Sequence, residues 1–435
     1  MEVVRNSYLN FVQFLKNSLE KISLVVYIAL ICVFVIYVCS LECRTLRFYC
    51  LLQNDKITSL SGYVESNPVL TSSGKYYMCD FSPIEVSSFD ENSKYSSFGK
   101  VKLLLPKNLV ESHFPGKLYS STGKTVFIEN GAKLFVKIKP SKNSTNSFSS
   151  TDDFFIVSDV DFLGWKNFIS KIRGILRLQF KRLMYMWGSA GGLLLALLSA
   201  SKEYTSSAFS ESFRLAGLSH ILALSGMHVS IFSGITEKTF KNIFGKNLTQ
   251  IISLFSVILF VFFAGLSPSL SRALISTIIL FFIKKFGIKM KVLDVLALSF
   301  LIQFLIFPQD SVAISFILSY LALFGILTFG EWIKPFFTRF LGSNLSTSLS
   351  SSVGAVLMTS PVSAFIWGYI TPIGIISTLV ISPLVTFFLV FGLISVILCL
   401  IFPFLSYPLG TILQIVYYII EYVAFLFAKA PPIIL

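Results

Sequence analysis

Apolar segments of membrane-spanning length recur along most of the chain, and they limit its possible folds more than any other feature. A membrane helix needs about 20 mainly apolar residues. We predict apolar spans at residues 22–41, 188–200, 216–236, 249–265, 267–284, 291–308, 311–330, 350–369, 373–402 and 404–428. Only 13% of the residues are charged, against about 25% in soluble proteins. The sequence therefore predicts a polytopic α-helical membrane protein with about 8–10 membrane helices, some of them short or interrupted.

The first span is predicted to anchor the N-terminus in the membrane. Residues 1–49 combine a mildly amphipathic segment with the apolar run 22–41, and no small-residue cleavage site follows that run. We therefore expect an uncleaved anchor rather than a removed signal peptide. The span at 373–402 is either one long helix or two re-entrant pieces, because Pro372, Gly374 and Pro383 interrupt it.

Residues 50–163 differ from the rest of the chain. Short alternating runs such as KITSLSGYVES and GKVKLLLP are separated by Gly, Pro, Ser and Asn, which is typical of a small antiparallel β domain. About five strands in this length fit an inserted, extracytoplasmic OB-like barrel, a fold whose sheet face often binds single-stranded nucleic acid. Cys43, Cys50 and Cys79 fall in or beside this domain, where a disulfide among them is allowed.

The β domain offers candidate DNA-binding residues. Aromatic rings could stack on bases and lysines could pair with phosphates. The candidates are Tyr63, Tyr76, Tyr77, Lys75, Lys100 and Lys102, with Phe81, Lys133, Lys137 and Lys139 as further members. The alternative is that these aromatic residues fill the barrel core and the lysines keep its surface soluble.

Residues 164–187 form a predicted basic amphipathic helix. Lysine and arginine occur there without any acidic residue, and apolar residues recur near helical spacing. Such a helix is expected to lie in the membrane interface, attracted by lipid headgroups. A DNA-guiding rim that includes Arg173, Arg177 and Lys181 is the alternative. The net charge of +14 fits anionic lipid, cytoplasmic-loop lysines or a polyanionic substrate equally well.

The remaining residues, 188–435, contain polar groups at membrane depth. In FRLAGLSHILALSGMHVSIFSGI, residues 213–235, His220, Ser225, Gly226, His228 and Ser230 interrupt an apolar pattern. Ionisable groups in a bilayer usually line a cavity or pair with each other. Gly226 allows a close approach of another backbone, or a break in the helix. We expect these groups to line or gate a passage, the alternative being ordinary helix packing.

A second polar interruption lies in FFAGLSPSLSRALIS, residues 262–276. Arg272 follows Pro268 and Ser269 in an apolar region, so it must reach the interface, pair or face water. An arginine facing a polar lumen could hydrogen-bond to passing phosphate groups. Asp310, beside Pro308, is expected to cap a helix start.

Several motifs in a fixed order resemble the ComEC family of competence proteins. GLSHILALSGMHVSIFSGI resembles the family pattern AGLSH-x-LA-x-SG-x-HV, and GLSPSLSRA resembles G-x-SPS-x-x-RA. SFILSYLALFGI and STLVISPLV are similar to its GFQLSFLAVLGI and NLLAVPLV elements. The agreement covers about residues 180–400, and the β domain resembles the OB-like domain that precedes the channel in this family.

The resemblance implies a multi-pass channel in the inner membrane that takes up single-stranded DNA during natural transformation. It implies channel-lining or gating roles for His220, Ser225, Gly226, His228, Ser269 and Arg272, with the OB-like domain guiding DNA. It implies no enzyme activity and no cofactor or metal. Expected partners are single-stranded DNA, membrane lipid, a separate nuclease, a DNA receptor, an ATPase or helicase of the competence machinery, and a second copy of the chain.

The chain departs from the family pattern in two respects. Ser315, Ile317 and Thr378 stand where Gly, Gln and Asn are common, so the polar contacts of those groups are expected to be absent. Many members also carry a C-terminal metallo-β-lactamase-like domain, and we expect this chain to lack it, because no HxHxDH cluster occurs.

Two other functions remain open from the sequence. Ser225, flanked by histidines, could be the nucleophile of an intramembrane enzyme. Interrupted helices could instead hold the midplane site of a small-molecule or ion transporter.

Overall fold

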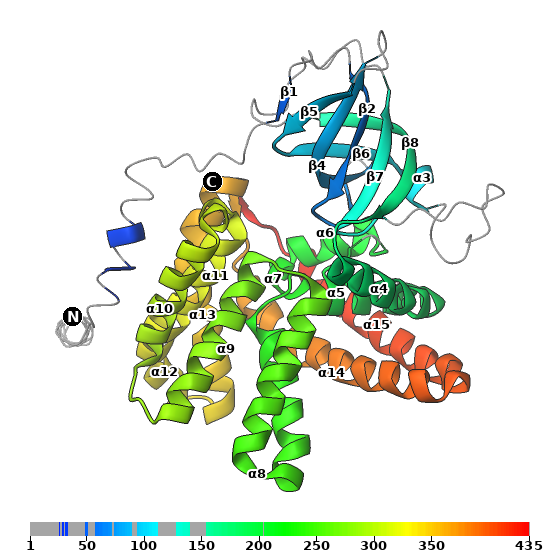
Figure 1. Cartoon of the computed structure of the whole chain (residues 1–435). Coiled ribbons are helices and arrows are strands. Elements are labelled where there is room, and N and C mark those ends of the chain that lie inside the picture. Colours follow the sequence, from blue (N-terminus) through cyan, green and yellow to red (C-terminus); the bar gives the residue numbers. More distant parts are fainter. Residues whose placement is uncertain are drawn as a thin grey trace.

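The computed structural model describes a β barrel and a bundle of helices (Figure 1). The described residues are 26, 28–29, 31–33, 48–50, 57–71, 74–88, 94–111, 128–139, 154–202 and 204–434. Most of the predicted anchor at 22–41, together with the segments 1–21 and 140–153 and residue Cys43, lies outside these ranges.

Five strands close the barrel. They are β2 (Ile57–Val64), β4 (Tyr76–Ser88), β6 (Val101–Pro106), β7 (Ala132–Ile138) and β8 (Phe154–Trp165). The order β4-β2-β7-β8-β6 returns to β4 through the β4–β6 pairing. All neighbours are antiparallel except β6 and β8, which are parallel. Shorter elements flank the ring, namely β1 (Tyr49–Cys50), β3 (Val69–Leu70), β5 (Lys94–Phe98) and α3 (Lys107–Glu111).

Alternation along each strand explains the barrel core. In β4, Tyr77, Cys79 and Phe81 all point inward and are at most 2% exposed, as the period of two requires. The predicted DNA contact of Tyr77 is therefore wrong for this structure, because its ring is part of the core. Cys79 is a free thiol in the same core, so it does not form the disulfide considered with Cys50.

The helical part begins beneath the barrel with α4 (Phe168–Met186) and α5 (Gly188–Ser199). The next helices are α6 (Ser207–Leu215), α7 (Ser219–Leu222), α8 (Gly226–Ala264), α9 (Pro268–Phe286), α10 (Val292–Ile306), η2 (Pro308–Val312), α11 (Ile314–Gly325), the π-helix η3 (Ile326–Gly330) and α12 (Glu331–Thr338). They are followed by α13 (Ser343–Trp367), β9 (Tyr369–Ile370), α14 (Gly374–Ile401), η4 (Pro403–Leu405), α15 (Ser406–Ala428) and β10 (Ile433–Ile434), and β10 pairs with β9.

Among the described residues, five helical segments are long and apolar enough to cross a membrane. These are Gly226–Ala264, Ile314–Thr338, Ser343–Trp367, Gly374–Ile401 and Pro403–Ala428. The segment 374–401 is one helix despite Pro383, which decides between the two predicted forms. The predicted single span at 216–236 is wrong, because the chain turns at Gly217 and is extended at Ala223 and Ser225 before α8 begins.

The long helix α8 is a hairpin of two antiparallel arms. Gly245 has φ 73° and ψ 172°, which is not helical, and glycine adopts positive φ at little cost. Ser233 hydrogen-bonds Ser253 at 2.8 Å, and Thr236 donates to Ser256 at 3.1 Å. The turn points away from the barrel (Figure 1), so the open end of the hairpin lies on the barrel side.

Candidate functional site

The motif at 216–229 forms a break between helices rather than a continuous helix. Gly217 has φ 73° and ends α6, with Leu218 N–H donating to the Phe213 carbonyl at 2.8 Å. The short helix α7 follows, and Ser225 is the N-cap of α8. The break therefore places the N-terminus of α8 beside other elements of the protein. Backbone N–H groups at a helix start lack partners within the helix and need partners from elsewhere.

His228 caps the start of α8. Its side chain is fully buried, and Nδ1 accepts the backbone N–H of Ser225 at 3.2 Å. The Ser225 hydroxyl lies 3.4 Å from the same nitrogen. A general base for Ser225 would need that nitrogen as an acceptor for the hydroxyl proton, and the backbone N–H already occupies it. The geometry therefore favours capping over Ser–His catalysis.

Arg272 lies against this helix start. It is 8% exposed, its Nε donates to the Ser319 hydroxyl at 2.9 Å, and its guanidinium carbon lies 5.9 Å from the centre of the Tyr320 ring. A Cβ on Gly226 would lie 3.0 Å from Nη2 of Arg272. Because residue 226 is a glycine, there is space for the guanidinium of Arg272. The two motifs at residues 213–235 and 262–276 therefore contact each other here.

A polar network extends from Arg272 into α10 and η2. Tyr320 donates its hydroxyl to Oε1 of Gln303 at 3.0 Å, and Nε2 of Gln303 donates to the Pro268 carbonyl at 2.9 Å and to Asp310 at 3.4 Å. The predicted capping role of Asp310 is wrong, because Asp310 lies inside η2 and Ala313 is the N-cap of α11. The Asp310 side chain instead accepts from Gln303. Gln303, Ser319 and Tyr320 were not predicted as site residues, although polar groups in apolar helices are themselves a signal.

The turn at Gly217 packs against the start of α14. A Cβ on Gly217 would lie 2.8 Å from the Gly374 Cα, so the two backbones approach closely. Ser377 donates its hydroxyl to the Ala216 carbonyl at 2.7 Å. This second contact joins the motif at 216–229 to the motif at 377–385.

The predicted lining residues are therefore only partly brought together. Ser225, Gly226, His228 and Arg272 form one group, and Ser269 donates to the Ser315 carbonyl at 3.3 Å beside it. His220 lies on α7 with an exposed side chain, and the contacts described above do not include it. Because His228 and Arg272 are buried, a substrate could pass between them only after α8, α9 and α11 separate.

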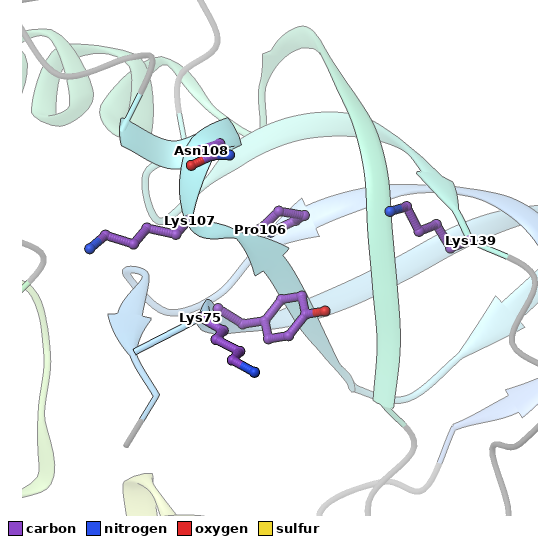
Figure 2. A pocket seen from close by; sticks show the side chains of 6 residues that line it. Lys75, Pro106, Lys107, Asn108 and Lys139 are labelled. Carbon is purple, nitrogen blue, oxygen red and sulfur yellow. The ribbon is translucent and has the colours of Figure 1, made fainter. Parts of the chain in front are cut away.

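The barrel carries a pocket of about 180 Å³ lined by Lys75, Tyr76, Pro106, Lys107, Asn108 and Lys139. Figure 2 shows Lys107 and Lys139 on opposite sides, with Lys75 and Pro106 between them. The N–H of Lys107 donates to the Lys75 carbonyl at 3.1 Å, which ties the two lysine backbones together. Lys75 and Tyr76, predicted from the sequence, line this pocket, whereas Lys107 and Asn108 were missed.

The other predicted residues of the barrel have protein partners. Lys100 forms an ion pair with Glu65 at 2.6 Å. Lys102 lies 5.6 Å from the centre of the Phe154 ring, and Lys166 lies 5.5 Å from that of Tyr63. Each of these residues would have to share or exchange its partner to bind DNA.

Arg177 and Lys181 do not form a solvent-facing rim. Arg177 is 1% and Lys181 7% exposed, and both pair with Glu129 of the barrel, with Arg177 Nε 2.9 Å from the Glu129 carboxylate. The predicted DNA contact is wrong for these two residues in this structure, because the barrel covers them. Arg173 is half-buried and donates to the Asn130 carbonyl at 3.4 Å. The exposed residues of α4 are mostly apolar, including Phe168, Ile169 and Leu176, with Lys171 exposed among them. The location of α4 in the membrane interface stays a prediction.

The Glu129 ion pairs predict a pH dependence of stability. Burial alone would raise the pKa of the Glu129 carboxyl, but the charges of Lys181 and Arg177 outweigh it and lower the pKa from 4.5 to about 2. The contribution is therefore complete above pH 4.5 and is lost as the pH falls toward 2, a change on the order of 3 kcal/mol. The melting temperature of the detergent-solubilised protein should fall between pH 5 and 3 less steeply in Glu129→Gln. Equal slopes would contradict this assignment.

Among the residues that the structure describes, no group of three or more His, Cys, Asp or Glu side chains is arranged to hold a metal ion. The arrangement instead offers buried hydrogen-bond donors in the helices and lysines on the barrel.

Comparison with known proteins identifies the family. The model of the Competence protein family matches residues 197–434, which is more than half of the chain. The chain belongs to the competence protein family. The match spans α6 to α15, so it includes the four motifs and the contacts among Gly226, Arg272 and Ser319. The resemblance found in the sequence is confirmed over these residues.

An uncharacterized protein of Aquifex aeolicus (strain VF5) is 27% identical to this competence-family chain over 210 residues. The alignment covers 48% of this chain and 48% of the relative, so the chain matches about half the length of that curated relative. No solved structure matches the chain.

Proposed function

We propose that this chain is an inner-membrane channel for single-stranded DNA during natural transformation, and that its barrel is an OB-like DNA guide. The observation that supports the proposal most strongly is the position of Arg272. Its guanidinium fills the space left by Gly226 at the start of α8 and bonds to Ser319 of α11. An ionisable side chain buried among apolar helices is costly to desolvate and is by default a candidate for a functional role, and phosphate groups are natural partners of a guanidinium.

The charge distribution supports an orientation with the barrel outside the cytoplasm. The turn of α8 and the C-terminus of α9 lie at the end away from the barrel, because α9 runs back along the second arm of α8. Lysines gather at this end, namely Lys238, Lys241, Lys246, Lys284, Lys285, Lys289 and Lys291. Cytoplasmic loops are enriched in Lys and Arg. The basic residues of α4 on the other side are partly neutralised by Glu129.

The barrel topology supports the OB-like assignment and its role as a guide. OB folds are five-stranded barrels that bind nucleic acids on one sheet face and through adjoining loops. The lysine pocket lies where β4 begins and where β6 and β7 end, so it is formed at such loops.

The DNA guide can be tested on the full-length protein. Combined Lys75→Ala, Lys107→Ala and Lys139→Ala substitutions should weaken binding of single-stranded DNA. They should also reduce the salt slope, the fall of log K with log salt concentration, by about 2, since each phosphate contact contributes about 0.7. Fluorescence anisotropy of a labelled oligonucleotide across salt concentrations measures both. Lys137→Ala is the control: Lys137 was also a candidate from the sequence, but the structure pairs it with Asp159 at 3.1 Å and leaves it out of the pocket lining. Equal salt slopes for the two variants would contradict a phosphate-binding pocket.

The proposal also includes partner proteins of the competence machinery. These are a separate ATPase or helicase that would supply energy and a separate nuclease that would degrade one strand.

A further inference from the structure

Arg177 makes more described hydrogen bonds than pairing with Glu129 requires. Its Nη1 donates to three backbone carbonyls, those of Ser199 at 3.0 Å, Phe263 at 3.0 Å and Ala264 at 3.1 Å. Its Nη2 donates to the Ser201 hydroxyl at 2.6 Å. The side chain is 1% exposed, so these bonds form away from solvent, where charge-assisted hydrogen bonds are strong.

The three carbonyls belong to the ends of two helices. Ser199 is the last residue of α5, and Ala264 is the last residue of α8. Carbonyl groups in the last turn of a helix lack partners within that helix, and a cation there is favoured by the helix dipole. Arg177 therefore caps two helices at once, and it holds the segment that leads directly into Pro268 and Arg272.

The same guanidinium also contacts the barrel. Arg177 Nε donates to Glu129 at 2.9 Å, and Lys181 pairs with the same carboxylate. Glu129 is 4% exposed and lies in the turn before β7. This turn packs on α4, since a Cβ on Gly131 would lie 2.7 Å from the Ser170 Cβ. One buried ionic cluster thus joins a barrel turn to the α8–α9 link.

We infer that Glu129 and Arg177 are positioning residues that hold the α8–α9 link, and with it Arg272, at a fixed position relative to the barrel. The family match does not include Glu129 or Arg177, because it begins at residue 197. The geometric part of the inference stands by itself. Its consequence for transport rests on the proposed function: a strand that moves the barrel acts on the Arg272 site through this cluster.

Disulfide cross-linking in native membranes tests the geometric part. The double substitution Ser269→Cys and Ser315→Cys reports the position of the link, because the Ser269 hydroxyl donates to the Ser315 carbonyl at 3.3 Å. Mass spectrometry of the linked peptides distinguishes this pair from native cysteines. Glu129→Gln should lower the cross-linking rate about tenfold, as expected when a buried charge loses its partner. Asp159→Asn, which breaks the exposed Lys137–Asp159 pair, should leave the rate unchanged.

A second variant keeps the inference testable if Glu129→Gln does not accumulate in the membrane. Glu129→Gln combined with Lys181→Met removes one negative and one positive charge, so the buried net charge is conserved while Arg177 still lacks its carboxylate. The same tenfold loss of cross-linking is expected. An unchanged rate in either accumulated variant would overturn the inference.

DNA uptake separates this inference from the proposed function. Arg177→Lys retains the charge but cannot reproduce the forked contacts of a guanidinium, so it should lower both cross-linking and uptake at equal protein abundance. Lost cross-linking with normal uptake would leave the geometric coupling intact and overturn its consequence for transport, whereas DNA uptake that is unchanged by deletion of the chain would contradict the DNA channel. Normal cross-linking with lost uptake would overturn the positioning role of Arg177.

Discussion

Arg272→Ala is expected to lower uptake of labelled single-stranded DNA by about tenfold to a hundredfold at unchanged protein abundance. The substitution removes the charge-assisted bond to Ser319, worth about 1.5–3 kcal/mol, and with it the proposed phosphate partner. Uptake by transformable cells carrying each variant, normalised to immunoblots of membrane fractions, measures the effect.

The matched control is Arg339→Ala, which removes an exposed cation of the helical part far along the chain from the site. It should leave uptake unchanged. Arg272→Lys tests the guanidinium itself and should recover only part of the activity, since lysine keeps the charge but loses the planar donor geometry. Wild-type uptake by Arg272→Ala, or loss of a transported solute without loss of DNA uptake, would contradict the proposed function.

Gly217→Ala is expected to destabilise the site by about 2 kcal/mol or more. The position has φ 73°, and an added Cβ would lie 2.8 Å from the backbone of Gly374. A non-glycine residue in this conformation costs about 1–3 kcal/mol, and the backbone contact adds to that cost. Unfolding of the detergent-solubilised protein by sodium dodecyl sulfate should occur at a lower denaturant fraction than in the wild type.

Gly234→Ala is the control for this prediction. Gly234 lies inside α8, and no atom would lie within 4 Å of an added Cβ. Alanine in a helix interior is favoured over glycine by about 0.5–1 kcal/mol, so this variant should be neutral or more stable. If the two variants unfolded at the same denaturant fraction, the prediction that stability depends on the close contact between Gly217 and Gly374 would be contradicted.

The meeting of Gly226 and Arg272 could be predicted in outline from the sequence. Each residue interrupts an apolar segment, and polar groups at membrane depth tend to find each other. Gly226 also allowed for the helix break that the structure contains. The assignment of residues 216–236 to one span failed because the apolar pattern is the same for a membrane helix and for buried short helices such as α7.

The burial of Arg177 and Lys181 could not be predicted from local sequence. Their partner Glu129 is 48 residues before Arg177 and belongs to a different domain, so the ion pair depends on how the barrel docks on α4. A basic amphipathic pattern is identical whether its charges face lipid headgroups, DNA or a buried carboxylate.

Strand alternation could have divided the tyrosines into two groups. Tyr77, Cys79 and Phe81 lie on one face of β4 and Tyr76 on the other, because side chains alternate with a period of two. The apolar members of the first set identify it as the core face. The pocket residue Lys107 had no such signal, since it follows the strand and its place depends on the closure of the barrel.

Photo-cross-linking of DNA in transit tests the central claim most directly. A photoreactive amino acid at Ser269, next to the Arg272 site, is compared with one at Phe365, whose side chain is 92% exposed on α13, a helix long and apolar enough to cross a membrane. During uptake of labelled DNA, irradiation should attach the label at position 269 and not at 365. Label at neither position while uptake proceeds, or equal labelling at both, would contradict passage of the strand beside Arg272.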